Sequence, residues 1–158
     1  MMRGRTVEIA PCAGFCFGVK RAVDTLEKAM HEAAPGATVA TLGPIIHNEV
    51  YVQSLKERGI VALDEAEAQK RAEEATREHP LVLIIRAHGI PEDTEKCLQE
   101  IAANNIYFTL LDCTCPFVKK IHRIAEECDP NEEFFLFLGD ENHPEVKGIV
   151  SRSGTKSL

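Results

Sequence analysis

The chain has 158 residues, of which 44% are hydrophobic, and its 18 Lys and Arg against 25 Asp and Glu give a net charge of −7. This acidic balance excludes a general nucleic-acid or membrane-surface binder, because such proteins need extended basic surfaces. The sequence contains no apolar run of the roughly 18 residues that predict a membrane span, and its amino terminus lacks a signal-peptide core. We therefore expect a cytoplasmic protein whose six cysteines stay reduced and serve metal or redox chemistry rather than disulfides.

The sequence predicts strands and helices that alternate along almost the whole chain. The predicted strands are Thr6–Ala10, Ala37–Leu42, Ile60–Leu63, Leu81–Ile85, Tyr107–Leu111 and Glu133–Leu138. The predicted helices are Gly18–Ala34, Asn48–Arg58, Glu65–Glu78, residues 91–103 and Pro116–Cys128. Alternation of this kind favours an α/β fold built on a parallel sheet with right-handed crossovers.

The stretch AGFCFGVKRAV, residues 13–23, joins the first predicted strand to the first predicted helix. Gly14 and Gly18 flank Cys16, so the backbone is free to turn sharply and to approach a bulky ligand. At the start of a helix, unpaired N–H groups and the helix dipole favour a thiolate over a thiol. Lys20 and Arg21, one turn further on, act in the same direction. The alternative is a tight turn with a buried packing thiol.

Five of the six predicted strands are followed by a cysteine or a histidine. These residues are Cys16, His47, His88, Cys115 and His143. Because ligands of an open parallel sheet bind at the carboxyl ends of its strands, we expect these side chains to meet at one edge. Glu145, two residues after His143 and directly after a proline, is a candidate proton donor.

The remaining histidines and two of the cysteines are interpreted as structural. His31, His79 and His122 fall on helix faces or in a charged loop, and Cys97 and Cys128 lie within or at the end of a helix. Residues in such places usually pack or hydrogen-bond without binding a ligand.

Two thiolates and several imidazoles around one cleft are compatible with more than one chemistry. Zinc ligands usually come in closely spaced cysteine pairs, whereas Cys16 and Cys115 lie about 100 residues apart. An iron–sulfur cluster accepts such open spacing and leaves the histidines to bind an anionic substrate, since imidazolium pairs well with phosphate oxygens. A zinc- or thiol-based redox sensor that uses Cys12, Cys16, Cys113 and Cys115 is an alternative interpretation.

Five motifs carry a family resemblance. In order they read GFCFGVKRAV, IIHNEVYVQSLKERG, RAHGIP, DCTCPFVKKIH and HPEVKG. They resemble the 4-hydroxy-3-methylbut-2-enyl diphosphate reductases, the iron–sulfur enzymes that end the non-mevalonate isoprenoid pathway. The similarity runs from about Val7 to Gly148.

The resemblance implies a trefoil of three α/β units around a central [4Fe-4S] cluster. Residues 1–112 would form the first unit and residues 113–158 the truncated start of a second. Cys16 and Cys115 match two of the three cluster cysteines, and the third is expected outside this chain. Either the chain is a fragment of a longer one, or it is a natural remnant.

The resemblance also implies the roles of the remaining site residues. His47, His88 and His143 match the histidines around the substrate diphosphate, and Glu145 matches the acid that protonates the allylic hydroxyl. The implied reaction removes that hydroxyl reductively, with two electrons from ferredoxin or flavodoxin and two protons, to give isopentenyl and dimethylallyl diphosphate. A non-catalytic diphosphate-binding module with the same histidine pocket is the alternative.

Overall fold

The computed structural model describes residues 6–129 and 131–154. Its strands are β1 (Thr38–Leu42), β2 (Val61–Leu63), β3 (Leu81–Ile85) and β4 (Phe108–Asp112). Its helices are α1 (Phe17–Glu32), α2 (Glu49–Glu57), α3 (Glu65–Glu73), α4 (Glu92–Asn104), α5 (Pro116–Glu127) and α6 (Pro144–Val150). Within the described residues, no helix combines the length and the apolar character needed to cross a bilayer.

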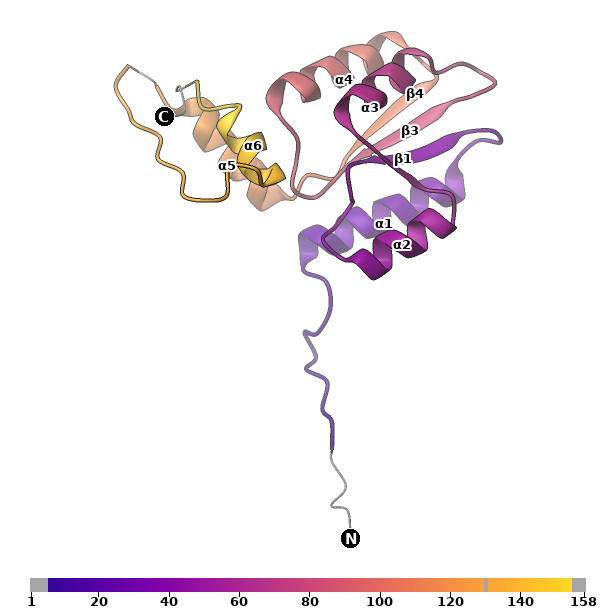
Figure 1. Ribbon diagram of the computed structural model, residues 1–158, viewed down its shortest axis with the longest axis horizontal. Helices are drawn as coiled ribbons and strands as arrows, with labels where there is room; N and C mark the ends of the chain where they lie inside the picture. Colours follow the sequence, from indigo (N-terminus) through magenta and orange to yellow (C-terminus); the bar gives the residue numbers. More distant parts are fainter. Residues whose placement is uncertain (1–5, 130, 155–158) are drawn as a thin grey trace.

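The strands form one parallel sheet in the order β2-β1-β3-β4. Helices α1 and α2 cover one face of this sheet, and α3 and α4 cover the other (Figure 1). The predicted parallel α/β fold is therefore confirmed. From β1 the chain moves outward to β2, and from β3 it moves outward in the opposite direction to β4. The point where the direction of winding changes lies between β1 and β3, which is where open sheets of this kind bind ligands.

Both faces of the central strands are packed against helices. Ile84 of β3 lies in the apolar layer that contains Leu26 of α1, and Ile85 lies in the opposite layer with Leu98 of α4. All four side chains are almost completely buried. Burial of an aliphatic side chain of this size contributes about 1.5–3 kcal/mol to stability. A run of consecutive apolar residues is thus what this strand requires.

Several helix boundaries follow from local signals in the sequence. The side chain of Asn48 accepts a hydrogen bond of 2.9 Å from the N–H of Tyr51, which caps α2. Asp64 caps α3 in the same way through the N–H of Glu67. Gly59 ends α2 with a φ of +86°, a conformation that suits glycine.

Two of the predicted strands do not form. Residues 6–10 and 133–138 are extended but unpaired, and Figure 1 shows the amino-terminal segment leading away from the sheet. Both segments carry the apolar residues of a strand, alternating at 6–10 and consecutive at 134–138, yet Ile9 is 82% exposed and Leu136 is 70% exposed. A strand needs a neighbour to satisfy its backbone groups, and no other described segment pairs with either one. The predicted helix Glu65–Glu78 also ends earlier, at Glu73.

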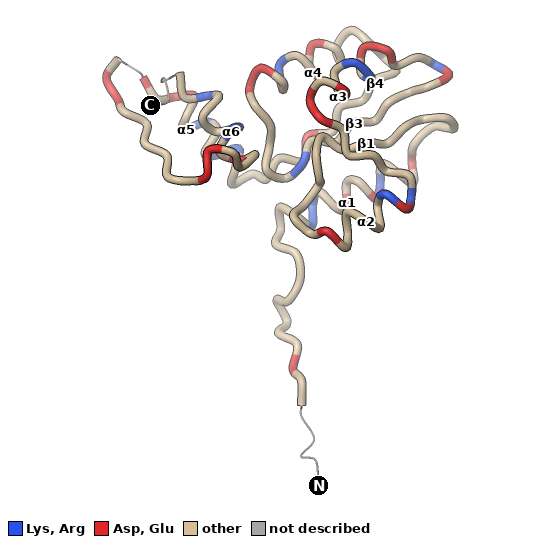
Figure 2. The backbone as a smooth tube through the Cα atoms, in the orientation of Figure 1, with Lys and Arg blue, Asp and Glu red and all other residues tan. Residues whose placement is uncertain are grey.

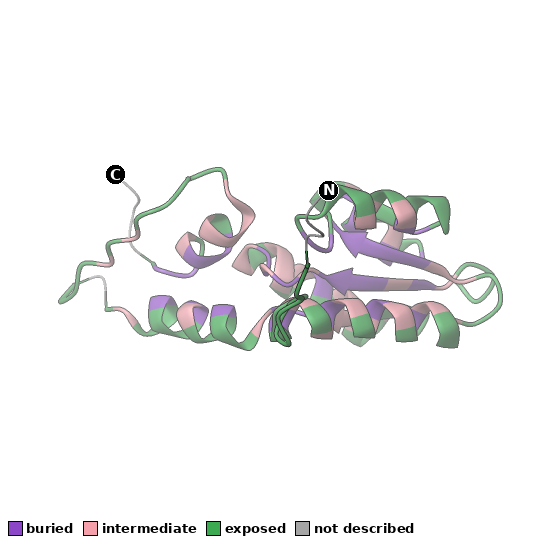
Figure 3. Cartoon of the chain, turned by 90° about the horizontal axis from the view of Figure 1, so that it is seen from below, coloured by how far each residue is buried: buried purple, intermediate pink, exposed green. Residues whose placement is uncertain are grey.

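Helices α5 and α6 lie beyond the carboxyl ends of the strands, to one side of the sheet (Figure 3). They pack against each other, and residues 131–143, which precede α6, form neither a helix nor a strand. Helix α6 was not predicted, but Pro144 at its first position and His143 at its cap explain why it begins there. The assignment of residues 113–158 to a second unit stays a prediction.

Charged residues of both signs are interspersed along the helices (Figure 2). Some of these charges are paired between neighbouring turns of one helix, as in the ion pairs of Lys20 with Asp24 and of Arg71 with Glu67. This pattern agrees with the exclusion of a general nucleic-acid binder.

Candidate functional site

Three histidines from distant parts of the chain meet at one place. The ring centroids of His47 and His88 lie 4.4 Å apart, those of His47 and His143 5.4 Å, and those of His88 and His143 5.7 Å. His47 follows β1, His88 follows β3, and His143 caps α6. The predicted convergence of these three residues is confirmed.

The sheet explains why the first two histidines are neighbours. β1 and β3 are paired in register, with Leu42 opposite Ile85, so the loops that follow them begin side by side. Buried residues next to the histidines, Ile46 and Ala87, anchor both loops to the core. His47 and His88 therefore lie at the change of winding direction, where a ligand site is expected.

Four helices begin close to the thiol and imidazole groups of the predicted site. Cys16 caps α1, Cys115 caps α5 and His143 caps α6, while His47 immediately precedes Asn48, the cap of α2. Neither cysteine side chain accepts a capping hydrogen bond. The N–H groups in the first turns of α1 and α5 thus have no side-chain cap from these residues, apart from Pro116, which has no N–H, and the positive ends of the helix dipoles favour anions there.

The contact between α1 and α5 brings Cys115 to the helix that Cys16 caps. A Cβ on Gly18 would be only 2.6 Å from the Sγ of Cys115, so this thiol rests against the first turn of the helix that Cys16 caps. Arg21 strengthens the contact, because its Nη2 donates a hydrogen bond of 2.5 Å to the carbonyl of Thr114. Glycine at position 18 is what permits this approach.

Burial sets the charge of His88. Desolvation, together with the positive charge of the neighbouring His47, Arg86 and His143, lowers its pKa to about 4. His88 is therefore neutral at physiological pH, and its buried Nδ1 has no hydrogen-bond partner in the described part of the chain. An unpartnered buried nitrogen costs stability, so a polar ligand atom would fit at this position.

Arg86 adds permanent positive charge next to His88. Its guanidinium is half-buried against Gly43, and its Nε donates a long hydrogen bond of 3.5 Å to the carbonyl of Gly89. Burial lowers the pKa of this guanidinium, but an arginine remains charged. Across residues 6–129 and 131–154, no carboxylate forms an ion pair with Arg86 or with the three histidines. The three histidines bring together nitrogen atoms that suit phosphate oxygens, whereas Arg86 lines a hollow that also contains Asp64 and Glu65.

Glu145 lies in the first turn of α6, partly exposed, and its backbone N–H donates to the Nδ1 of His143 at 3.3 Å. The carboxyl group is therefore carried by the same turn as one of the histidines. Among the described residues, no three His, Cys, Asp or Glu side chains are arranged to hold a metal ion by themselves.

The other cysteines are not gathered at the site. Cys113 is 2% exposed within the apolar layer under α1, and burial raises the pKa of its thiol. Cys12 is exposed in the extended amino-terminal segment. The redox sensor built on four thiols therefore loses support, because Cys113 points into the core.

Sequence reasoning gave no role at the site to Arg86 or His122. Arg86 is the first residue of the RAHGIP motif, so it was visible as a basic residue near His88. His122 was interpreted as structural, and it is buried in contact with Gly89 and Gly148. No pattern in the sequence indicates that contact, since it joins three separate motifs.

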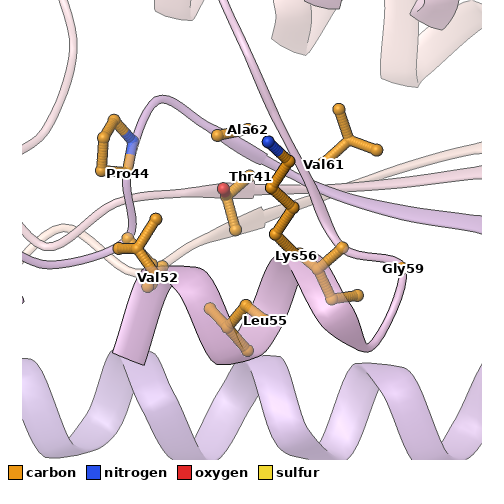
Figure 4. Close-up of a pocket in the computed structure, with 10 residues that line it drawn as sticks. Thr41, Pro44, Val52, Leu55, Lys56, Gly59, Val61 and Ala62 are labelled. Carbon is orange, nitrogen blue, oxygen red and sulfur yellow. The ribbon is translucent and has the colours of Figure 1, made fainter. Parts of the chain in front are cut away.

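Away from the histidines, a hollow of about 330 Å³ lies between α2 and the strands β1 and β2 (Figure 4). Apolar side chains such as Val52 and Leu55 line it, together with Thr41 and Lys56. No histidine or cysteine is among its lining residues, so it lacks the groups of the predicted site.

The fold and the site define a parallel α/β protein with histidines and cysteines gathered beyond the carboxyl ends of its strands. The family model described as LytB protein matches residues 7–158, so the chain belongs to that family. Relatives named 4-hydroxy-3-methylbut-2-enyl diphosphate reductase include those of Alkaliphilus oremlandii, 38% identical over 143 residues, and Aquifex aeolicus, 39% identical over 142 residues. These matches cover 90% of this chain but 46% and 44% of the relatives. The chain thus spans about half the length of the curated relatives it matches.

Solved structures agree with this family. A structure of (E)-4-hydroxy-3-methyl-but-2-enyl diphosphate reductase, the terminal enzyme of the non-mevalonate pathway, is similar with a TM-score of 0.68 and 37% identity. The similarity covers 92% of this chain and 46% of that one. The Plasmodium falciparum reductase has a TM-score of 0.70 over 90% of this chain and 40% of its own, and at 24% identity it supports the fold alone.

The buried histidines predict how stability depends on pH. The pKa values of His88 and His122 are lowered to about 4, from an ordinary value of 6.5. Between these values the unfolded chain binds protons that the folded chain does not, so the free energy of unfolding should fall as pH decreases. Each histidine contributes a slope of at most about 1.4 kcal/mol per pH unit.

Urea unfolding between about pH 7 and about pH 5 measures this slope. His122→Gln should reduce the slope even if it lowers overall stability, whereas His31→Gln, at an exposed position, should leave it unchanged. An unaltered slope in His122→Gln would contradict the assignment of a depressed pKa.

Proposed function

We propose that this chain carries the diphosphate-binding histidines, two cluster cysteines and the acid of a 4-hydroxy-3-methylbut-2-enyl diphosphate reductase. The main support is the convergence of His47, His88 and His143, with ring centroids 4.4 to 5.7 Å apart, at the edge of the sheet that the family motifs also mark. Membership of the LytB family and the printed names of the relatives support the same reaction.

The donor chemistry of the site fits an iron–sulfur cluster. Cys16 and Cys115 cap α1 and α5, Cys115 rests against the first turn of α1, and cysteine thiolates are the protein ligands of such clusters. Cys16 and Cys115 would each hold one iron, and the third cysteine would come from outside this chain. When bound, the cluster supplies the two electrons, received from ferredoxin or flavodoxin.

The histidines and Arg86 would hold the diphosphate. His88 is neutral and would donate a hydrogen bond to a phosphate oxygen through the ring nitrogen that carries the proton, while Arg86 supplies permanent positive charge near it. Bound phosphate oxygens would accept from these donors and raise the pKa of His88, since an anion favours the imidazolium. Diphosphate binding should therefore take up protons.

Glu145 would deliver the proton that lets the allylic hydroxyl leave. The C–O bond breaks, the hydroxyl leaves as water, and two electrons and a second proton complete the new C–H bond of isopentenyl or dimethylallyl diphosphate. Because Glu145 shares the first turn of α6 with His143, the group that binds the substrate also fixes the direction of the acid.

The cluster assignment is tested with cysteine variants. After anaerobic reconstitution, Cys16→Ser and Cys115→Ser should lower iron and sulfide content and the absorption near 400 nm, a region typical of this cofactor class. Cys97→Ser and Cys128→Ser are the matched controls and should behave as the unaltered chain. Equal iron content in all four variants would overturn the assignment. A colourless chain that still binds inorganic diphosphate would instead support a non-catalytic binding module.

The diphosphate assignment is tested at His88. Loss of one charge-assisted contact typically costs about 1.5–3 kcal/mol, so His88→Ala should weaken inorganic diphosphate binding by about tenfold or more. Isothermal titration calorimetry measures the affinity and, in two buffers, the predicted proton uptake. His79→Ala, at an exposed position far from the motif, should bind normally. Unchanged affinity in His88→Ala would remove this residue from the site.

The role of Glu145 is tested by turnover with reduced ferredoxin. Glu145→Gln keeps size and hydrogen bonding but removes the acid, so it should lower kcat by about 10²-fold or more with a nearly unchanged KM. The assay uses the cluster-loaded protein at the length that supports turnover. A near-normal kcat would contradict this role and show that another group delivers the proton.

A further inference from the structure

Helix α6 approaches the turn after β3, residues 86–91, unusually closely. A Cβ on Gly148 would lie 3.2 Å from the carbonyl oxygen of Ile90 and 3.4 Å from the Nε2 of His122. Ile90 is 1% exposed and its carbonyl belongs to the backbone, so it has little room to move. A side chain at position 148 would therefore require α6 and this turn to separate by at least a few tenths of an ångström.

A buried arginine ties the same two segments together. The Nη1 of Arg152 donates to the carbonyl of Ile90 at 2.8 Å and to that of Gly148 at 2.5 Å. Its other nitrogens pair with Glu126 of α5 and Glu95 of α4. The side chain is 2% exposed, so its charge depends on these partners, and loss of one of them leaves charge uncompensated.

Two further contacts hold α6 in this place. The hydroxyl of Ser151 accepts a hydrogen bond of 3.0 Å from the N–H of Glu92, the first residue of α4. The ring of His122 fills the space on the other side, since a Cβ on Gly89 would lie 2.8 Å from its Cε1. The turn that carries His88 is thus packed against α6, the helix that His143 caps, and contacts from α4 and α5 support this packing.

We propose that Gly148 and Arg152 are positioning residues, whose contact with Ile90 places His143 and Glu145 against His47 and His88. His143 caps α6 and Glu145 lies in its first turn, so a shift of the helix moves both. Ile90 follows His88 by two residues. Its contact with Gly148 and Arg152 therefore fixes the position of α6 relative to the turn that carries His88. The inference rests on the proposed function only where diphosphate affinity is the measurement.

The test uses Gly148→Ala and Gly148→Val in the full chain, with inorganic diphosphate as the probe. We expect affinity to decrease in that order, by roughly tenfold for Gly148→Val, which is the size expected when one contact is lost. Alanine and valine both favour a helix more than glycine does, so a weaker helix cannot explain the loss. Lys147→Ala, at an exposed position on the same helix, is the control and should bind as the unaltered chain.

A double-mutant cycle separates positioning from general damage. In a His143→Ala background, Gly148→Val should cause no further loss of affinity, because the residue through which it acts is gone. An additive loss in that background, or normal affinity in a folded Gly148→Val, would overturn the proposal. If Gly148→Val does not fold, Gly148→Ala is carried through the same cycle.

A structural measurement keeps the two hypotheses distinguishable. If the unaltered chain does not bind diphosphate, the proposed function fails, and the positioning role is judged by NMR contacts between the rings of His143 and His47. These rings are 5.4 Å apart in the unaltered chain. Weaker contacts in Gly148→Val support the proposal, and unchanged contacts overturn it.

Discussion

The structure depends on the burial of β1 and β3 on both faces of the sheet. Because helices must cover each face, the chain winds outward from these strands in opposite directions, and their carboxyl ends stay open. The loops that follow them carry His47 and His88 and are held by buried neighbours. The position of the site is therefore a consequence of how the sheet is packed, and the chemistry of the site is added by the loops.

The site is built from groups that the protein leaves partly unsatisfied. The Nδ1 of His88 and the Nε of Arg21 are buried without hydrogen-bond partners in the described part of the chain, and helices α1 and α5 begin without side-chain caps. Each buried unpaired group costs about 1–3 kcal/mol, which the apolar layers offset. A bound anion or a negatively charged cluster would satisfy these donors, so the same features that lower stability prepare the site for a ligand.

The second group of helices completes the site from the opposite side. α5 brings Cys115 to the first turn of α1, and α6 brings His143 and Glu145 to the histidines of the sheet. Both helices lie beyond the strands and have no sheet of their own within the described residues. Their placement depends on a few close contacts, at Gly18 for α5 and at Gly148 for α6. Glycine is required at such points because a side chain would separate the backbones.

The sequence by itself determined the parallel α/β fold, the central strands, the caps Asn48 and Asp64, and the three histidines that meet. These features depend on local patterns: consecutive apolar residues for a strand buried on both faces, and a short polar side chain before a helix. The same local logic predicted strands at residues 6–10 and 133–138, and there it was wrong, because pairing depends on a neighbour that a pattern does not reveal. The tertiary structure alone decided that His88 is neutral, that Cys113 points into the core, and that Gly148 and Arg152 hold α6 against Ile90. Burial, desolvation and close backbone contacts arise between segments far apart in the chain, so no pattern within one segment encodes them.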